Sequence, residues 1–133
     1  MFSVKQAFEI SYAHRLMLHK GRCKFLHGHN AIIEVELAAP KTARNGMVLD
    51  FGEIKAALKS WLAERLDHKT LLNKKDPLAS ALKKAGEKPV LLDGEPTAEN
   101  MAALVFNAAK QLGLKPCKVS VRETANSCAE YRP

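Results

Sequence analysis

The stretch HGHNAIIEVELAA, residues 27–39, shows the clearest strand pattern in the chain. Glutamates alternate along it with the apolar residues Ala31, Ile33, Val35 and Leu37. A period of two predicts a strand with one buried face. Extended backward, the buried parity includes His29 and His27, so the pattern places two imidazoles on the core side of a sheet.

Residues 2–14 alternate in the same way, with Phe2, Val4, Phe8, Ile10 and Tyr12 on one parity. His14 continues that parity, so we expect it to point inward as well. Two histidines on one face of an extended chain can bind the same metal ion, and His14 is the natural third ligand. Three histidines with an open position are typical of a catalytic zinc site. The alternative is a chance pair of loop histidines.

Cys23 lies four residues before His27, between Arg22 and Lys24. A cysteine between two cations is favoured as a reactive thiolate. It is therefore a candidate base or nucleophile beside the metal. Two alternatives are a fourth ligand, which would close the site, and an ordinary loop cysteine.

Capping signals predict two helices. Asp50, with Glu53 three residues later, forms a capping-box pattern at the start of a helix over residues 51–66. Thr97 is the expected N-cap of a second helix, which ends at Gly113.

The rest of the chain completes an α+β pattern. Residues 73–96 contain three prolines and are expected to be irregular, with one short helix around Leu78–Lys84. Residues 117–122 alternate as a strand, and the stretch CAEYR favours a short last strand. The order of elements predicts a small antiparallel sheet covered by helices on one face.

Three polar residues outside the histidine cluster are further candidates. Asp67 and His68 follow the first helix, where the helix dipole favours a protonated histidine and a carboxylate can orient it for proton transfer. The alternative is a solvated pair at a helix end. Glu123 falls on the apolar parity of its strand, so it is either an ion-paired edge residue or a carboxylate that accepts N–H donors from a ligand.

Composition bounds the class of protein. With 47% apolar and 26% charged residues, residues 1–133 are expected to form one domain with its own core. The lack of a long apolar run or signal-peptide pattern, with three cysteines in no scaffold spacing, favours a cytoplasmic protein with reduced thiols. The net charge of +7 suits a small polyphosphate ligand. Nucleic-acid binding lacks support, because no basic arm or aromatic platform is present.

Six stretches, in order along nearly the whole chain, resemble the 6-pyruvoyltetrahydropterin synthase / 6-carboxytetrahydropterin synthase family. They are FEISYAHRL, CKFLHGHN, GMVLDFGEIK, RLDHKTLLN, PTAEN and VSVRETANSCAEY. The resemblance implies a tunnelling fold, an α+β fold with a four-stranded antiparallel sheet and two helices on one face. It also implies that three protomers close a barrel and that two trimers stack as a homohexamer, which removes exposed sheet edges.

The same resemblance assigns roles to residues. It implies that Zn²⁺ is bound by His14, His27 and His29. Cys23 would be the catalytic thiol, working with Asp67 and His68 from a neighbouring subunit. Glu123 would hold the pterin ring through the N–H donors of that ring.

The implied substrate is 7,8-dihydroneopterin triphosphate. The spacing Cys-x3-His-Gly-His is similar to that of queuosine-pathway members, which make 6-carboxy-5,6,7,8-tetrahydropterin and release acetaldehyde and triphosphate, so we expect this lyase activity. The pyruvoyl-forming enzyme is the alternative in the same fold, and a non-catalytic zinc module that binds RNA is the alternative of another class. Two departures bear on the substrate: residues 73–96 are longer than in compact members, and Ala31 stands where an aromatic residue is common.

Overall fold

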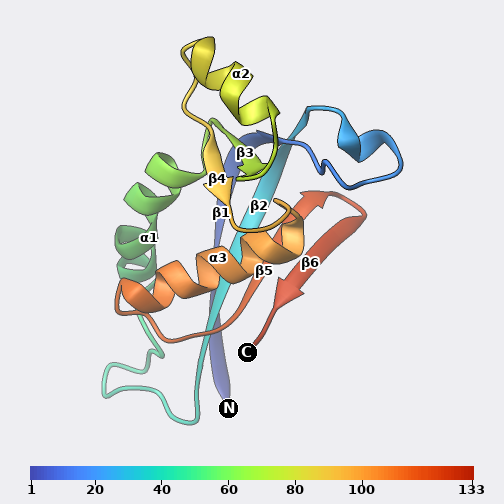
Figure 1. Ribbon diagram of the computed structural model, residues 1–133. Helices are drawn as coiled ribbons and strands as arrows, with labels where there is room; N and C mark the ends of the chain where they lie inside the picture. Colours follow the sequence, from blue (N-terminus) through green and yellow to red (C-terminus); the bar gives the residue numbers. More distant parts are fainter.

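The computed structural model describes residues 1–133, and a mixed sheet runs through it (Figure 1). The strands are β1 (Phe2–His14), β2 (His27–Ala39), β3 (Lys69–Asn73), β4 (Val90–Leu92), β5 (Pro116–Thr124) and β6 (Ser127–Tyr131). The helices are α1 (Phe51–Arg65), α2 (Leu78–Lys84) and α3 (Ala98–Gln111), with one 3-10 turn at Arg22–Lys24.

The sheet has six strands, in the order β4-β3-β1-β2-β5-β6, so the expectation of four antiparallel strands is wrong. The pairs β1–β2, β2–β5 and β5–β6 are antiparallel, whereas β3 lies parallel to both β1 and β4. The two extra strands have five and three residues, which is too short for alternation to be read from the sequence. The resemblance implied two helices and the structure has three, the third being the short helix expected at Leu78–Lys84.

The two long strands bring distant residues of the N-terminal third together. β1 and β2 pair in antiparallel fashion over their whole length, which sets Tyr12 opposite His29 and His14 opposite His27. This end of the sheet lies beside the loop that carries the 3-10 turn, and both chain termini lie at the other end (Figure 1).

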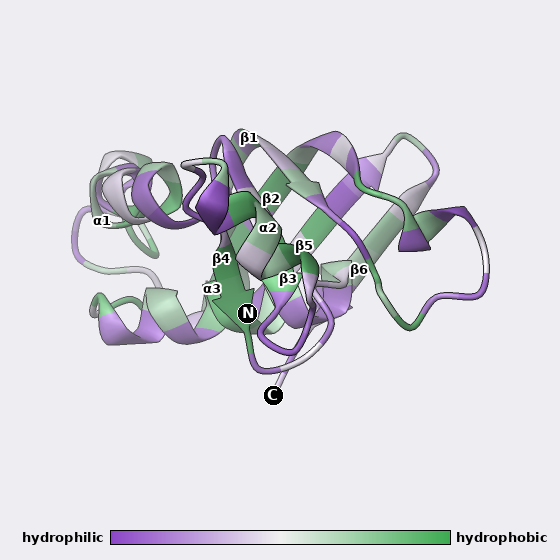
Figure 2. Ribbon diagram, turned by 45° about the horizontal axis from the view of Figure 1, so that its top comes forward, coloured by the Kyte–Doolittle hydropathy of each residue, from purple (hydrophilic) through white to green (hydrophobic).

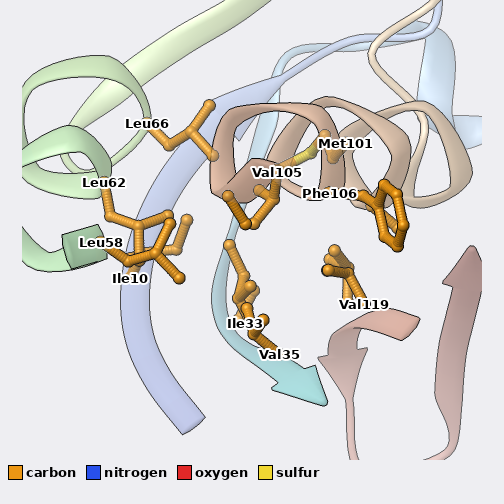
Figure 3. Packing of buried hydrophobic residues seen from close by; sticks show 14 of the residues in the cluster. Ile10, Ile33, Val35, Leu58, Leu62, Leu66, Met101, Val105, Phe106 and Val119 are labelled. Carbon is orange, nitrogen blue, oxygen red and sulfur yellow. The ribbon is translucent and has the colours of Figure 1, made fainter. Parts of the chain in front are cut away.

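One face of the sheet is covered by α1 and α3. α1 packs over β1, and α3 packs over β5 and β6. Figure 3 shows the resulting core, in which apolar side chains of both helices meet apolar side chains of the strands. Its buried members include Ile10, Ile33, Val35, Leu58, Leu62, Leu66, Met101, Val105, Phe106 and Val119.

The other face of the sheet carries paired charges. Lys118 on β5 lies 3.0 Å from Glu36 on β2 and 3.3 Å from Glu130 on β6, measured from its ammonium nitrogen to a carboxylate oxygen. Hydrophobic and hydrophilic segments consequently alternate along the long strands in Figure 2. This confirms that the strand alternation marks one buried face and one polar face.

The helix ends match the capping signals. Asp50 and Glu53 form a complete capping box at the start of α1. Thr97 accepts a hydrogen bond from the Asn100 amide at the start of α3, and Gly113 adopts a φ of 90° just past its end. No helix combines the length and apolar character needed to cross a membrane.

Candidate active site

Three histidines from the paired ends of β1 and β2 form one cluster. Ring nitrogens of His14, His27 and His29 all lie within 4.8 Å of one another. The ring centroids are 4.6 Å apart for His14 and His27, and 5.1 Å apart for His27 and His29. Two features produce this convergence: side chains alternate along a strand, and the antiparallel register of β1 and β2 sets His14 opposite His27.

Backbone carbonyls fix the orientation of two of these rings. The Nδ1 atom of His14 lies 2.7 Å from the Pro96 carbonyl oxygen, and that of His27 lies 2.7 Å from the Phe25 carbonyl oxygen. A carbonyl can only accept, so Nδ1 of each ring carries the proton and donates it. Each Nε2 is then left with a free lone pair, as a metal-binding imidazole requires.

His14 provides the test of whether a metal ion fits this cluster. Its Nε2 atom is buried and has no hydrogen-bond partner, which is costly in a protein interior. Burial lowers the pKa of His14, so the ring stays neutral, the form that binds metals. An ion held by the three rings would give the unpartnered nitrogen its partner, and three imidazoles suit zinc among other transition metals.

Gly28 separates the two histidines of β2 and lies against β1. A Cβ atom at this position would lie 3.0 Å from the Tyr12 carbonyl oxygen, a backbone atom that cannot move aside without shifting β1. A glycine between the two histidines therefore allows the strands to approach closely where the cluster forms.

Glu123 reaches the cluster from β5. Its Oε1 atom accepts a hydrogen bond of 2.8 Å from the Tyr12 hydroxyl, and its Oε2 atom lies 3.3 Å from Nε2 of His29. Burial raises the pKa of Tyr12, and the hydrogen bond to Glu123 and the charge of that carboxylate raise it further. The only ion-pairing neighbour of Glu123 is His29, so this carboxylate is bound up with the histidine cluster.

The cluster opens on a cavity of about 550 Å³, a size common for small-molecule sites. Its other polar wall residues are Cys23, Thr97, Glu99, Thr124, Ser127 and Cys128. Cys23, on the 3-10 turn, thus shares one cavity with the histidines and Glu123. All three cysteines of the chain are free thiols in the structure.

Asp67 and His68 lie outside this cavity. The Oδ1 atom of Asp67 accepts from the Ser11 amide at 2.8 Å and lies 3.0 Å from Nδ1 of His68. His68 has a φ of 56° and donates its own amide to the Ser11 carbonyl at 2.6 Å. Its side chain is 80% exposed and lines another depression of about 390 Å³, whose walls include Ser11 and Ala13 and also Tyr12 and His29. Ser11 and Ala13 alternate with the core residues of β1, so the Asp67–His68 pair belongs to the other face of the sheet.

The segment that precedes α3 is tied to the loop after β1. The guanidinium of Arg15 forms a bidentate ion pair with Asp76, which is 3% exposed. The Leu18 amide donates to the Glu95 carboxylate at 2.7 Å. Because Pro96 follows Glu95 directly, the contact between Leu18 and Glu95 helps to hold the carbonyl that orients His14.

Sequence reasoning did not identify several of these contacts. Tyr12 was expected only as a core residue and Thr97 only as a helix cap, yet Tyr12 bonds Glu123 and Thr97 lines the cavity. The tyrosine hydroxyl on a buried parity was the available signal, because a buried hydroxyl requires a hydrogen-bond partner. No sequence signal points to the Pro96 carbonyl.

Comparison with known proteins places the chain in a family. The profile of the family described as "6-pyruvoyl tetrahydropterin synthase" matches residues 3–133. The chain belongs to this family. It is 37% identical over 109 residues to the 6-carboxy-5,6,7,8-tetrahydropterin synthase of Rickettsia felis, covering 80% of this chain and 79% of that protein. It is 30% identical over 142 residues to the enzyme of the same name from Haemophilus influenzae, covering 99% of both chains.

A solved structure shows the same fold. The 6-pyruvoyl tetrahydropterin synthase of Caenorhabditis elegans superposes with a TM-score of 0.73 at 24% identity, over 99% of this chain and 95% of that one. The tunnelling fold implied by the sequence resemblance is therefore confirmed, with the six-stranded sheet as its form in this protein. As a member of this family, the chain is an enzyme of the pterin synthase type.

Proposed function

We propose that this protein is a zinc-dependent lyase. It would convert 7,8-dihydroneopterin triphosphate and water to 6-carboxy-5,6,7,8-tetrahydropterin, the queuosine-type product, with release of acetaldehyde and triphosphate. The observation that carries the proposal is the meeting of three histidines, a cysteine and a carboxylate in one cavity. The names of the curated relatives support the carboxy product over the pyruvoyl product.

In this proposal the cavity residues have three roles: binding of the metal ion, binding of the pterin ring and transfer of a proton. His14, His27 and His29 would hold the ion through the nitrogen atoms that converge. Bound Zn²⁺ supplies Lewis-acid chemistry, which makes the hydroxyl protons of a bound substrate more acidic. Glu123 would accept paired N–H donors of the pterin ring, and Cys23 would take up and return a proton at its Sγ atom.

Asp67 and His68 would serve the cavity of a neighbouring subunit. Their side chains lie 3.0 Å apart, from Nδ1 of His68 to Oδ1 of Asp67, and outside the histidine cavity of their own chain. The sheet also has two open edges, at β4 and β6. Three copies that closed into a barrel would pair these edges, and two such trimers would give the proposed homohexamer.

The test is incubation of the zinc-loaded protein with 7,8-dihydroneopterin triphosphate, with acetaldehyde and the pterin product measured together. The proposal expects both acetaldehyde and 6-carboxytetrahydropterin. A pyruvoyl product without acetaldehyde would move the protein to the other branch of the family. No turnover of the substrate by the zinc-loaded protein would contradict the proposal.

Two cysteine variants sharpen this test. Cys23→Ala should keep zinc and lose turnover, since the thiol is assigned to proton transfer. Cys117→Ala is the matched control, because Cys117 is exposed and absent from the cavity wall. Loss of zinc in Cys23→Ala would instead make Cys23 a ligand and the metal site a closed one.

A further inference from the structure

Tyr12 occupies the point where the histidine cluster and Glu123 meet. It lies on β1 two residues before His14 and directly opposite His29 on β2. Its ring packs edge-on against His14, with centroids 5.2 Å apart, and tilted against His29 at 5.8 Å. The residue is 4% exposed, so its surroundings fix its ring and limit the positions of its hydroxyl.

The only polar contact of this hydroxyl is the carboxylate of Glu123. The hydroxyl donates to Oε1 at 2.8 Å, while the other carboxylate oxygen faces His29 at 3.3 Å. A carboxylate on a strand can rotate about its side-chain bonds, and a hydrogen bond from a fixed donor removes much of that freedom. Each carboxylate oxygen has a second lone pair, so the contact with Tyr12 leaves Oε1 able to accept another donor.

We propose that Tyr12 is a positioning residue, whose hydroxyl holds the Glu123 carboxylate in the plane that accepts two parallel N–H groups of a pterin ring. This inference rests on the proposed function, which assigns the ring to Glu123. The geometry gives a reason for the tether: it holds Oε1 while Oε2 lies beside His29, and without it the whole carboxylate is free to rotate out of the plane that the ring needs. Affinity for the ring therefore depends on a residue that does not touch the ring.

The variant that tests this is Tyr12→Phe, which removes the hydroxyl and keeps the ring packed against the histidines. Binding of 7,8-dihydroneopterin, which lacks the triphosphate, is measured by calorimetry on the zinc-loaded protein. We expect the Kd to rise by about tenfold, because a hydrogen bond to a charged group is stronger than one between neutral groups. The zinc affinity, measured by competition with a chelator, should stay within about twofold of that of the unmodified protein.

Tyr131→Phe is the matched control, since Tyr131 is the other tyrosine of the chain and packs on Phe106 away from the cavity wall. It should change neither constant. The double variant Tyr12→Phe/Glu123→Ala should bind the pterin as weakly as Glu123→Ala alone, because the hydroxyl acts through the carboxylate.

The outcomes separate this inference from the proposed function. If the unmodified protein does not bind 7,8-dihydroneopterin, the positioning role is overturned, and the proposed function is decided by turnover of the triphosphate. If it binds and Tyr12→Phe binds equally well, the positioning role is overturned and the proposed function stands. Lower thermal stability of Tyr12→Phe with unchanged affinity would give Tyr12 a structural role only, which also overturns the inference.

Discussion

His14 lies on β1, and the backbone amide of His68 donates a hydrogen bond to β1, yet their side chains differ strongly in exposure. His14 is 2% exposed, and its free nitrogen points into the histidine cluster. The side chain of His68 is 80% exposed, and it contacts Asp67 on the other face of the sheet. Neighbouring residues of one strand thus support an interior cluster and a surface pair, because side chains alternate between the two faces.

The difference in exposure suggests different roles for the histidine cluster and for the Asp67–His68 pair. The interior cluster is complete within one chain, so the fold alone can preorganise it. The exposed pair does not line the cavity that the histidines share, so in the proposed function its use depends on another copy of the chain. Under the proposed function, zinc binding should be a property of the protomer and turnover a property of the assembly.

The largest expected effect is on zinc affinity. His27→Ala should lower it by at least about 100-fold and abolish turnover, since it removes one of three ligands. His68→Ala should leave zinc affinity within about twofold and also abolish turnover. Chelator competition and product formation measure the two properties separately. Equal loss of zinc in both variants would contradict the idea that zinc binding depends on the histidine cluster and not on the Asp67–His68 pair.

Mixing of subunits tests whether the pair serves another chain. Cys23→Ala and His68→Ala should each be inactive as pure proteins. After the two are unfolded together and refolded in equal amounts, activity should return to about a quarter of the wild-type value, since that fraction of shared sites carries neither substitution. No recovery from refolded mixtures would mean that both residues act within one chain.

Loss of the Arg15–Asp76 ion pair should affect the cluster more weakly. Arg15→Met should reduce the free energy of unfolding by about 2 kcal/mol, because it leaves the buried Asp76 carboxylate without its cation. Zinc affinity should fall by about tenfold, because Arg15 follows the proposed ligand His14 directly and the end of β1 loses a fixed contact. Lys74→Met, which breaks an exposed pair with Asp93, is the control and should change neither property. Unchanged zinc affinity in Arg15→Met would show that this ion pair does not support the histidine cluster.

The same pair predicts a pH dependence. Arg15, chiefly through its hydrogen bond, holds the pKa of Asp76 below its ordinary value. The ionised carboxylate therefore stabilises the fold above the ordinary carboxyl pKa of about 3.9, and this contribution is lost as the pH falls through the lowered pKa. Chemical unfolding of the wild type should show this acid-side loss, and Arg15→Met should show a smaller one.

The smallest effect is expected from Asp50→Ala, at the end of α1 away from the Asp67–His68 pair. It removes the capping box and should reduce the free energy of unfolding by about 1 kcal/mol. Zinc affinity and turnover per folded protein should not change. A loss of turnover per folded protein in this variant would show that the exposed pair depends on the whole length of the helix.

The inward direction of the three histidines could be predicted from the sequence because strand alternation is a local pattern. Alternation puts His14, His27 and His29 on core parities, and the capping signals fix both long helices within a residue or two. The position of Glu123 on an apolar parity likewise indicated a carboxylate that needs a polar partner, and the structure shows that partner to be the Tyr12 hydroxyl.

The remaining features depend on contacts between distant residues. β4 has three residues and pairs in parallel with β3, so nothing in its own sequence separates it from a loop. The Pro96 carbonyl lies 82 residues from His14, and a carbonyl is present at every residue. The Tyr12–Glu123 bond spans 111 residues. Such contacts follow from sheet order and register, which local patterns do not specify.

Gly28 has a consequence for how mutational data on this protein would be interpreted. It has no functional group, but any side chain there would meet the backbone of β1 at 3.0 Å. In a saturation-mutagenesis survey, position 28 should therefore tolerate fewer replacements than an ordinary strand position, as should the histidines on either side. Intolerance at three consecutive positions would then have two causes, ligand chemistry at the outer two and the space between two strands at the middle one.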